Sequence, residues 1–561
     1  MENAQMAYYI DGDYENDVLP KPEKTFYSSA YSSTNSAYSP ILLKPELQKS
    51  INEQAFDEVV DFYNQNEQLF QNFASENGVD VWFFEQFRMY FSYRTFFLRL
   101  ACIRQFLSEN EKGIVITSDK TLQDFIASDH LEFVPTEKWA KANKKKMLRE
   151  LFLMLRKTKF KHKQEHDNLI LSRIEDDREG KDQRFGVIEL ECDKLFNRES
   201  FNPNKSHKLD ASVYNDSRNV DQLMGHYFFG VKWLFELWKF RKSFKTLSAE
   251  LGKKTEGNAK IILSLFRQNE MSFYIYYLRY RAFCKFFKKT NYKGILFINE
   301  NSAQQKAIQF AAAQHKVKVF GIQHGAIYDL HPAYMFGKYK QAPILPTITF
   351  TWGNYFTQLL LEKGGYQKEQ VITAGRLEPI NTNRKRNAAI QTDKKVIVYA
   401  TQPQPDTNLR KRELRDVFAA AKQFKANYQL VLRPHPAELS DQFFLELANE
   451  VDFTDLLIDR ESDLQTHFET AAILITSYST VGAEFIPYNK PLLVLDYLDA
   501  DLVNYIKQGV GIPVRSLDNL IAVLGKDELD IDQIAYDAFV SNYFYAKGEK
   551  AVGIILDEIS S

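Results

Sequence analysis

The sequence has few cysteines, no long apolar run and almost no net charge, and each scarcity excludes a class of protein. The three cysteines, Cys102, Cys192 and Cys284, lie far apart and outside any metal-ligand spacing, so neither a disulfide framework nor a zinc site is expected. No segment reaches the ~18 apolar residues of a membrane span, and no secretion signal opens the chain. The net charge of -1 provides no general attraction for nucleic acid. We therefore expect a cytoplasmic protein with no nucleic-acid partner.

Two glycine-rich signatures of phosphate binding are missing as well. The chain contains neither GxxxxGK followed by Ser or Thr, nor GxGxxG. Hydrolysis of ATP and redox chemistry with a dinucleotide therefore have no support from the sequence.

The sequence is organised as apolar strands separated by helical segments. Its 561 residues are too many for one core and suit two or three domains. After residue 385 the alternation is regular, and the strand segments are nearly continuous runs of Val, Ile and Leu, which predicts a parallel sheet covered on both faces. The strands expected there are KVIVYA, YQLVLR, DLLID, AILIT and PLLVLD; those expected earlier lie at 113–118, 168–176, 185–190, 294–300 and 317–325.

This pattern predicts an α/β fold with two Rossmann-like domains and helical insertions in the first. Helical periodicity dominates residues 45–112 and 218–290, whereas the first residues are rich in Ser, Tyr, Asn and Pro without a period. The predicted boundaries are a disordered tail over 1–40, an N-terminal domain over 41–345, a linker over 346–384, a C-terminal domain over 385–545, and a final helix over 546–561 that packs back on the first domain.

Polar side chains follow three strands of the second predicted domain. Parallel sheets bind ligands beyond the carboxyl ends of their strands. Ser477, Ser479 or Thr480 is suited to cap the helix that begins here, and a helix N-terminus attracts phosphate. An ordinary cap without a ligand is the alternative. The residues expected at this edge are Thr401, Gln402, Pro403 and Gln404 after the first strand, Arg433, His435 and Pro436 after the second, and Ser477, Ser479 and Thr480 after the third.

The first predicted domain has a second group of candidate residues. Glu300 ends the strand GILFINE, His324 ends the next strand, and Asp329 follows in the loop. A carboxylate or a histidine at neighbouring strand ends is suited to act as a base or nucleophile. For Glu300 the alternative is a helix cap.

Two further stretches carry cations beside apolar residues. The run 138–163 contains eleven Lys and Arg, and 273–289 reads FYIYYLRYRAFCKFFKK. A solvated helix face and a buried core helix are the ordinary interpretations. The alternatives are contact with anionic lipid or glycan for the first, and a membrane-interface helix or glycan-stacking surface for the second.

Together these motifs resemble bacterial surface-polysaccharide glycosyltransferases of the GT-B fold. Capsular Kdo transferases pair a QP motif with an HP motif, as Gln402-Pro403 (or Gln404-Pro405) and His435-Pro436 do here. Polysialyltransferases pair HP with a serine-rich motif, and teichoic-acid glycerophosphotransferases have a similar layout. The resemblance extends over about 290–558 through IQHG, RPHP and SYSTVGAEF. It implies that the HP histidine and the serines hold the nucleotide and its phosphate, and it adds Gly375 and Glu484 to the donor-binding set.

The resemblance implies a metal-independent glycosyltransferase without a cofactor, since no paired-aspartate motif follows an obvious strand. We expect Kdo or another acidic sugar to move from a CMP-activated donor to a glycan or lipid-linked glycan of capsule or lipopolysaccharide, with possible peripheral contact at the inner membrane. Glu300, His324 and Asp329 are the catalytic candidates. The alternatives are a transferase that uses CDP-glycerol or a UDP-sugar, a sugar-nucleotide epimerase, and a non-catalytic GT-B protein.

Overall fold

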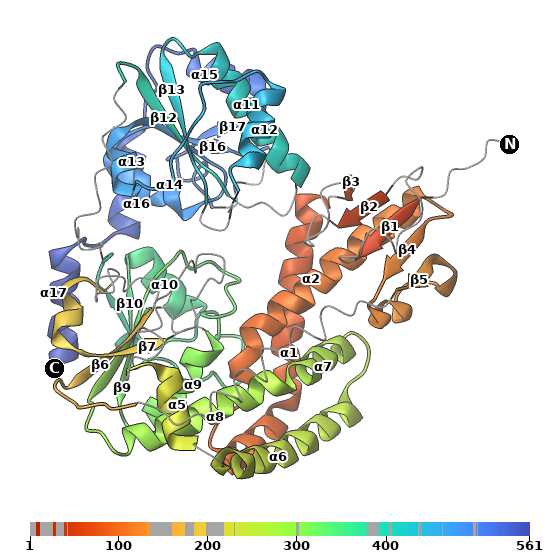
Figure 1. Ribbon diagram of the computed structural model, residues 1–561, viewed down its shortest axis with the longest axis vertical. Helices are drawn as coiled ribbons and strands as arrows, with labels where there is room; N and C mark the ends of the chain where they lie inside the picture. Colours follow the sequence, from red (N-terminus) through yellow and green to blue (C-terminus); the bar gives the residue numbers. More distant parts are fainter. Residues whose placement is uncertain are drawn as a thin grey trace. The chain divides into compact units, whose positions relative to one another are not determined.

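The structure of the protein is a computed structural model (Figure 1). The chain divides into two units, one formed by residues 1–49, 98–135 and 381–542, and the other by 50–97, 136–380 and 543–561. The structure describes residues 7–11, 26–29, 39–41, 43–134, 160–173, 185–197, 218–228, 231–298, 302–377, 392–402, 407–435, 438, 440–462, 464–497, 501 and 503–561.

The C-terminal part of unit 1 is built on a six-stranded parallel sheet. The strand order is β14-β13-β12-β15-β16-β17. The strands are β12 (Lys395–Ala400), β13 (Tyr428–Arg433), β14 (Leu457–Ile458), β15 (Ala471–Thr476), β16 (Leu492–Leu495) and β17 (Ile512–Val514). The helices are α11 (Thr407–Gln423), α12 (Gln442–Glu450), α13 (Leu464–Thr470), α14 (Thr480–Phe485), α15 (Leu517–Leu524) and α16 (Gln533–Tyr543).

Both faces of this sheet are buried because its strands carry apolar residues in nearly every interior position. Ile397 and Tyr399 point to one face, where they pack with Phe418 of α11 and Leu520 of α15. The residue between them, Val398, points to the other face and is also buried. Burial on both faces explains why these strands have continuous apolar sequences.

The order of the strands reverses direction next to β12. From β12 the chain adds β13 and β14 on one side, and it then adds β15, β16 and β17 on the other. In open parallel sheets such a reversal leaves a crevice beyond the carboxyl ends of the two strands that flank it. The switch point of this sheet therefore lies between β12 and β15.

Unit 2 contains a second six-stranded parallel sheet in the order β11-β10-β9-β8-β6-β7. Its core joins Leu296 and Phe320 of the sheet to Ile555 and Ile559 of the last helix. The strands are β6 (Asn168–Arg173), β7 (Asp193–Asn197), β8 (Gly294–Ile298), β9 (Lys318–Ile322), β10 (Ile348–Thr351) and β11 (Val371–Thr373). The helices outside its helical layer are α5 (Val220–Phe228), α9 (Ala303–Gln314), α10 (Asn354–Glu362) and α17 (Glu549–Ser560).

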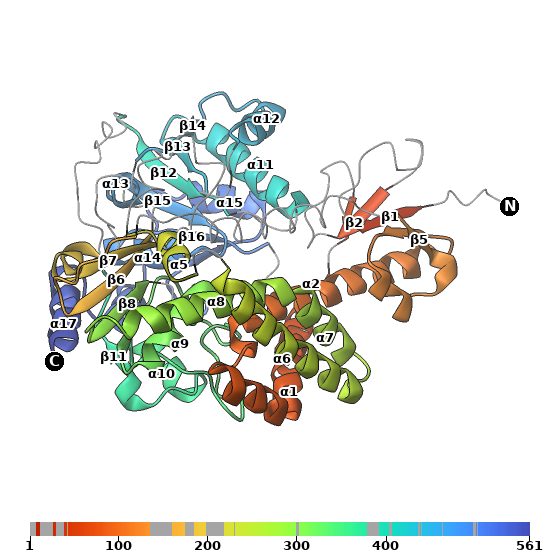
Figure 2. The same cartoon turned by 60° about the horizontal axis from the view of Figure 1, so that its bottom comes forward.

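A helical layer completes unit 2 (Figures 1 and 2). It contains α6 (Lys232–Lys254), α7 (Ala259–Gln268) and α8 (Glu270–Phe287), with the unit 2 parts of α1 (Pro45–Asn77) and α2 (Trp82–Glu109). Aromatic rings fill its interior, and Phe240 of α6 stacks on Tyr277 of α8 with ring centroids 4.3 Å apart. Of the interpretations left open for the stretch 273–289, the structure thus supports a largely buried core helix. No described helix is both long enough and apolar enough to cross a membrane.

A third parallel sheet, in the order β3-β2-β1-β4-β5, was not predicted. Its strands are β1 (Tyr8–Asp11), β2 (Phe26–Ser29), β3 (Ser39–Ile41), β4 (Ile114–Thr117) and β5 (Leu131–Phe133). The prediction of a disordered tail over 1–40 is therefore wrong for the first three strands. These strands are too short to show a period in sequence, and within the described residues only β1 of the three pairs with a strand remote in the chain, β4.

Two further predictions are corrected by the second sheet. Residues 346–384 do not form a simple linker, because β10 and β11 within this range pair with each other and β10 pairs with β9. Residues 186–191 form a 3-10 helix instead of a strand, with Val187 and Leu190 exposed, and the strand is 193–197. The first two sheets confirm the α/β fold with two Rossmann-like domains, the GT-B fold class.

Candidate active site

The three polar strand ends of the C-terminal sheet meet at one edge. β12 lies between β13 and β15. The Thr401 N–H donates to the Arg433 carbonyl at 3.1 Å, and the Thr476 hydroxyl donates to the Ala400 carbonyl at 3.1 Å. Gln402, His435 and Ser477 therefore follow neighbouring strands at the switch point. Pro403, Gln404 and Pro436 lie outside the described residues.

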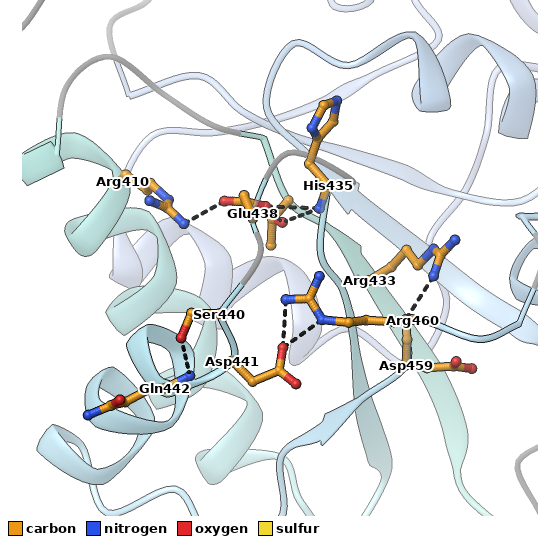
Figure 3. A network of polar contacts seen from close by, with 10 residues as sticks. Arg410, Arg433, His435, Glu438, Ser440, Asp441, Gln442, Asp459 and Arg460 are labelled. Atoms are coloured by element: carbon orange, nitrogen blue, oxygen red, sulfur yellow. Dashed lines mark hydrogen bonds and ion pairs between the residues drawn. The ribbon is translucent and has the colours of Figure 1, made fainter. Parts of the chain in front are cut away.

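A buried carboxylate holds the backbone of His435 (Figure 3). The His435 N–H donates to Glu438 Oε2 at 2.9 Å and to Thr401 Oγ1 at 3.1 Å, and the Thr401 hydroxyl donates to the same Glu438 oxygen. Arg410 of α11 donates to Glu438 Oε1 at 2.5 Å. The Glu438 N–H in turn donates to the His435 carbonyl at 2.8 Å. We call this set of four residues the Glu438 clamp.

Glu438 was missed in the sequence, although a signal for it exists. A capping box places a Glu three residues after the first residue of a turn, and the two residues exchange hydrogen bonds that involve their backbone N–H groups. The same spacing joins His435 and Glu438. The clamp ties the end of β12 to the turn after β13, so His435 has a defined position at the switch point.

The imidazole of His435 is half-buried, and burial lowers its pKa, while the Glu438 carboxylate acts in the opposite direction. A lowered pKa keeps the ring neutral at pH 7, with one nitrogen as donor and the other as acceptor. In Figure 3 the ring points away from the Glu438 carboxylate. The side chain is therefore oriented for contact with a group other than its own clamp.

Arg433, a predicted donor-binding residue, makes a contact within the sheet. Its Nη1 donates to the Asp459 carbonyl at 3.1 Å (Figure 3). Next to it, Arg460 forms an ion pair with Asp441 at 2.6 Å. The first bond connects β13 to the segment after β14, and the ion pair connects that segment to the start of α12.

The serine cluster divides into two kinds of side chain. The Ser477 hydroxyl donates to Glu413 Oε2 at 3.0 Å, and both residues are buried. Ser479 is the N-cap of α14, where its Oγ accepts from the Val481 N–H at 3.3 Å. The Ser477 proton is thus committed to a carboxylate, whereas Ser479 uses a lone pair and keeps its own O–H as a donor.

A buried tyrosine fixes the start of α14. The Tyr505 hydroxyl donates to the Ser479 carbonyl and accepts from the Ala483 N–H, both at 2.8 Å. Gly482 leaves room for this ring, since a Cβ there would lie 2.7 Å from it. The helix is only six residues long, with Thr480 first and the half-buried Glu484 fifth. Hydroxyl groups, more than a helix dipole, therefore define the chemistry of this strand end.

Two side chains add further character to the switch point. The Gln402 Oε1 atom is buried and has no hydrogen-bond partner among the described residues. Burial raises the pKa of Tyr478 to about 12, with smaller contributions from Glu413 and Glu438, so its hydroxyl remains protonated. A buried acceptor without a partner is costly unless a ligand or water satisfies it. Gln402 is thus suited to accept from a ligand N–H or O–H.

In unit 2, β8 and β9 pair directly, with Ile298 opposite Ile322. The strands predicted to end in Glu300 and His324 are therefore neighbours, although Glu300 itself lies outside the described residues. His324 is exposed at its strand end. The preceding residue is fixed because the Trp352 N–H donates to Gln323 Oε1 at 2.8 Å. His324 thus extends from a rigid strand end.

The loop after His324 contains a second histidine and the third catalytic candidate. Burial lowers the pKa of His331 to about 4, with a further contribution from nearby His324. Asp329 is exposed and forms an ion pair with Lys363 at 2.5 Å. This pairing engages the Asp329 carboxylate, so His324 is the described candidate best suited to act as a base.

Arg94 of α2 was missed in the sequence because nothing local connects residue 94 with residues 324–331. Its guanidinium lies 4.9 Å from the Phe91 ring centroid, and its charge acts on Tyr328 in the loop after His324. The pKa of Tyr328 is nevertheless raised by burial. The loop thus has a cation beside it that is able to attract an anionic group.

Gly375, predicted to lie near the donor, has a clear structural role in unit 2. Its φ is +106°, and a Cβ would lie 2.3 Å from the Ala546 carbonyl oxygen. The next N–H, of Arg376, donates to that oxygen at 2.9 Å. Glycine is required here for close packing of residues 546–547. Within the described parts of the chain, no group of three or more His, Cys, Asp or Glu is placed to hold a metal ion.

The comparison with protein families gives a match to a part of the second half of the chain. Residues 361–558 match the family described as CDP-glycerol:poly(glycerophosphate) glycerophosphotransferase. This range contains the Glu438 clamp and both serines. The protein is an enzyme of the transferase class. The match favours the CDP-glycerol alternative over the expected CMP-Kdo donor, and no curated protein has a sequence that matches this chain.

Several solved structures are similar in architecture at low identity. S. aureus MnaA in a co-structure with UDP is 15% identical over 50% of this chain and 77% of that chain, with a TM-score of 0.35. The wall teichoic acid polymerase TagF is 16% identical over 50% and 84%, with a TM-score of 0.35. The UDP-GlcNAc 2-epimerase from Methanocaldococcus jannaschii is 13% identical over 51% and 82%, with a TM-score of 0.38. At scores this low, the fold assignment depends on the sheets themselves.

Proposed function

We propose that this protein transfers glycerol phosphate from a CDP-glycerol-type donor to a cell-surface polymer. The observation that carries the proposal is the family match over 361–558, which includes every described strand end of the C-terminal switch point. The chemistry of these strand ends supports it. His435, Ser479 and Gln402 provide a neutral imidazole, a hydroxyl donor and a buried acceptor, a set of contacts suited to a nucleotide and its phosphates.

The reaction needs little covalent chemistry from the protein. An acceptor hydroxyl attacks the phosphorus that carries glycerol, a new P–O bond forms, the P–O bond of the diphosphate breaks, and CMP leaves. The acceptor proton passes to a base. We assign this role to His324, with Glu300 and Asp329 as the alternatives, and we assign stabilisation of the leaving CMP to His435 and Ser479.

The proposed partners are the nucleotide donor and a glycan or lipid-linked glycan acceptor. No cofactor and no metal are included in the proposal. The three cysteines of the protein are free thiols, which fits a cytoplasmic enzyme. We also propose peripheral contact with a membrane surface, where a lipid-linked acceptor would lie.

A panel of nucleotides tests the donor. CDP should raise the melting temperature more than CMP, UDP or GDP, because the nucleotide that binds most tightly stabilises the folded state most. A ligand at 100-fold its dissociation constant adds about 2.7 kcal/mol to the free energy of unfolding. Stronger stabilisation by UDP would overturn the donor assignment in favour of a UDP-sugar, and stabilisation by CMP alone would favour the CMP-sugar expectation.

The base assignment is tested with CDP-glycerol and a surface-polymer acceptor. His324→Asn should bind the donor normally yet release CMP at least about a hundred-fold more slowly, the scale of a lost general base. His435→Ala should instead weaken CDP binding about ten-fold or more, since a hydrogen bond to a charged group contributes about 1.5–3 kcal/mol. Near-normal turnover by His324→Asn would return the search to Glu300.

A further inference from the structure

Helix α6 has an apolar row on a face that the described part of the chain leaves exposed. Its buried face includes Trp233, Phe244 and Leu247, which belong to the interior of the helical layer. On the other side, Val231 is 73% exposed, Leu234 49%, Phe235 68% and Trp238 62%. An outer helix face of this kind is normally polar. We call these four residues the exposed row.

The exposed row forms one continuous stripe. Residues 234, 235 and 238 follow residue 231 by three, four and seven positions. The four side chains therefore lie within an arc of about 100° around the helix. The rings of Phe235 and Trp238 are 6.3 Å apart. Figure 1 shows α6 at the lower edge of the helical layer. The two rings therefore form a small aromatic surface on a convex element.

Cations surround this row. Lys232, Lys239, Arg241, Lys242 and Lys245 are exposed around the same face. Lys242 and Lys245 continue the row toward the end of the helix, at four and seven residues from Trp238. The one acidic residue between 232 and 245, Glu236, points inward and pairs with Arg281. The face thus has an apolar centre and a cationic margin.

We propose that this face of α6 docks on the surface of an anionic bilayer. Aromatic rings settle at the level of lipid headgroups, and Lys and Arg beside them bind anionic headgroups. A second copy of the chain fits less well, because a two-fold contact would bring the same cations together. A protein partner would need an acidic groove for this convex helix, whereas a bilayer surface needs none.

The proposal moves the membrane contact to a new place in the chain. The stretch 273–289 is largely buried in the helical layer, and most of the basic run 138–163 lies outside the described residues. The inference names the surface for the membrane contact in the proposed function. Vesicle binding requires no donor, so the two proposals are able to fail separately.

Co-sedimentation with vesicles tests the inference on the full chain. The protein should bind vesicles that contain phosphatidylglycerol and bind pure phosphatidylcholine at least about ten-fold less, with binding weakened by salt. Phe235→Ser with Trp238→Ser should lower the affinity for anionic vesicles about ten-fold or more, and so should Lys239→Glu with Lys242→Glu. Ile534→Ser, which alters a residue of α16 that is 84% exposed, is the matched control and should bind as the wild type.

Unchanged melting temperature and unchanged CDP affinity should show that the α6 variants remain folded. The inference would be overturned if Phe235→Ser with Trp238→Ser bound anionic vesicles with the affinity of the wild type, or if the wild type bound no vesicles. A concentration-dependent dimer in light scattering that the serine variant abolishes would assign the row to a second copy instead. A lysate protein bound through this row, without any vesicle binding, would equally overturn it.

Discussion

Replacement of Glu438 by Gln should weaken both the C-terminal sheet and the nucleotide site. The carboxylate accepts from the His435 N–H and the Thr401 hydroxyl with one oxygen, and from Arg410 with the other. Glutamine has the same size but only one acceptor oxygen. Whichever way the amide turns, its NH2 group faces a donor on one side, so part of the clamp is lost.

The size of the effect follows from burial and charge. Glu438 is only 7% exposed, and a hydrogen bond to a charged group contributes about 1.5–3 kcal/mol. The Arg410 side chain is 22% exposed, so water compensates part of its loss. We expect the free energy of unfolding of this part to fall by about 2 kcal/mol, and its melting temperature to fall by about 4–8 °C. A loosened His435 turn should weaken CDP binding about ten-fold.

Calorimetric melting and CDP titration on the same preparation measure the two effects. The matched control is Asp441→Asn, which breaks the nearby ion pair with Arg460 but leaves the His435 turn intact. Since both partners are partly exposed, this change should cost about 0–1 kcal/mol and leave CDP affinity unchanged. If Glu438→Gln melts earlier yet binds CDP as well as the control, Glu438 is an anchor of the fold and has no part in positioning His435.

The two serines and the buried histidine allow sharper tests. Ser479→Ala should lower the affinity for CDP about ten-fold and leave the affinity for free cytidine unchanged. Ser477→Ala should mainly lower the melting temperature, because the Ser477 hydroxyl donates to Glu413. The reverse pattern would show that the roles of the two serines are exchanged. His331 has a folded pKa of about 4 and an unfolded pKa of about 6.5, so between these pH values the unfolded state binds a proton that the folded state does not. The free energy of unfolding of unit 2 should therefore fall by up to about 3 kcal/mol as the pH falls from 6.5 to 4. The melting temperature of His331→Gln should depend less steeply on pH than that of the wild type. An equal dependence on pH in this variant would contradict the assigned pKa.

Most elements of the two large sheets could be predicted from local sequence. Strands such as KVIVYA and AILIT are continuous apolar runs, and burial on both faces requires this composition wherever the strand is placed. The candidate residues at their ends, His435, Ser479 and Gln402, could be predicted for a related reason. Polar and proline-rich segments after a buried strand mark the sheet edge at which ligands bind.

The sequence failed where an element depends on its pairing partners rather than on its own composition. The strands 8–11, 26–29 and 39–41 are three or four residues long, and their pairing in the third sheet gives them order that no local pattern reveals. In the same way, 186–191 has strand-forming residues, yet it forms a 3-10 helix just before β7. Apolar composition predicts burial, and it does not by itself identify a partner.

The sequence alone therefore determined the fold class and the edge that carries the candidate donor residues, because hydrophobic pattern and turn chemistry are local. Only the tertiary structure decided that β12 lies between β13 and β15, that Glu438 holds His435, and that Ser477 serves Glu413 while Ser479 keeps a donor. It also decided that Phe235 and Trp238 are exposed while the neighbouring Trp233 is buried. These outcomes depend on strand order and side-chain packing, which arise from contacts between residues far apart in the chain.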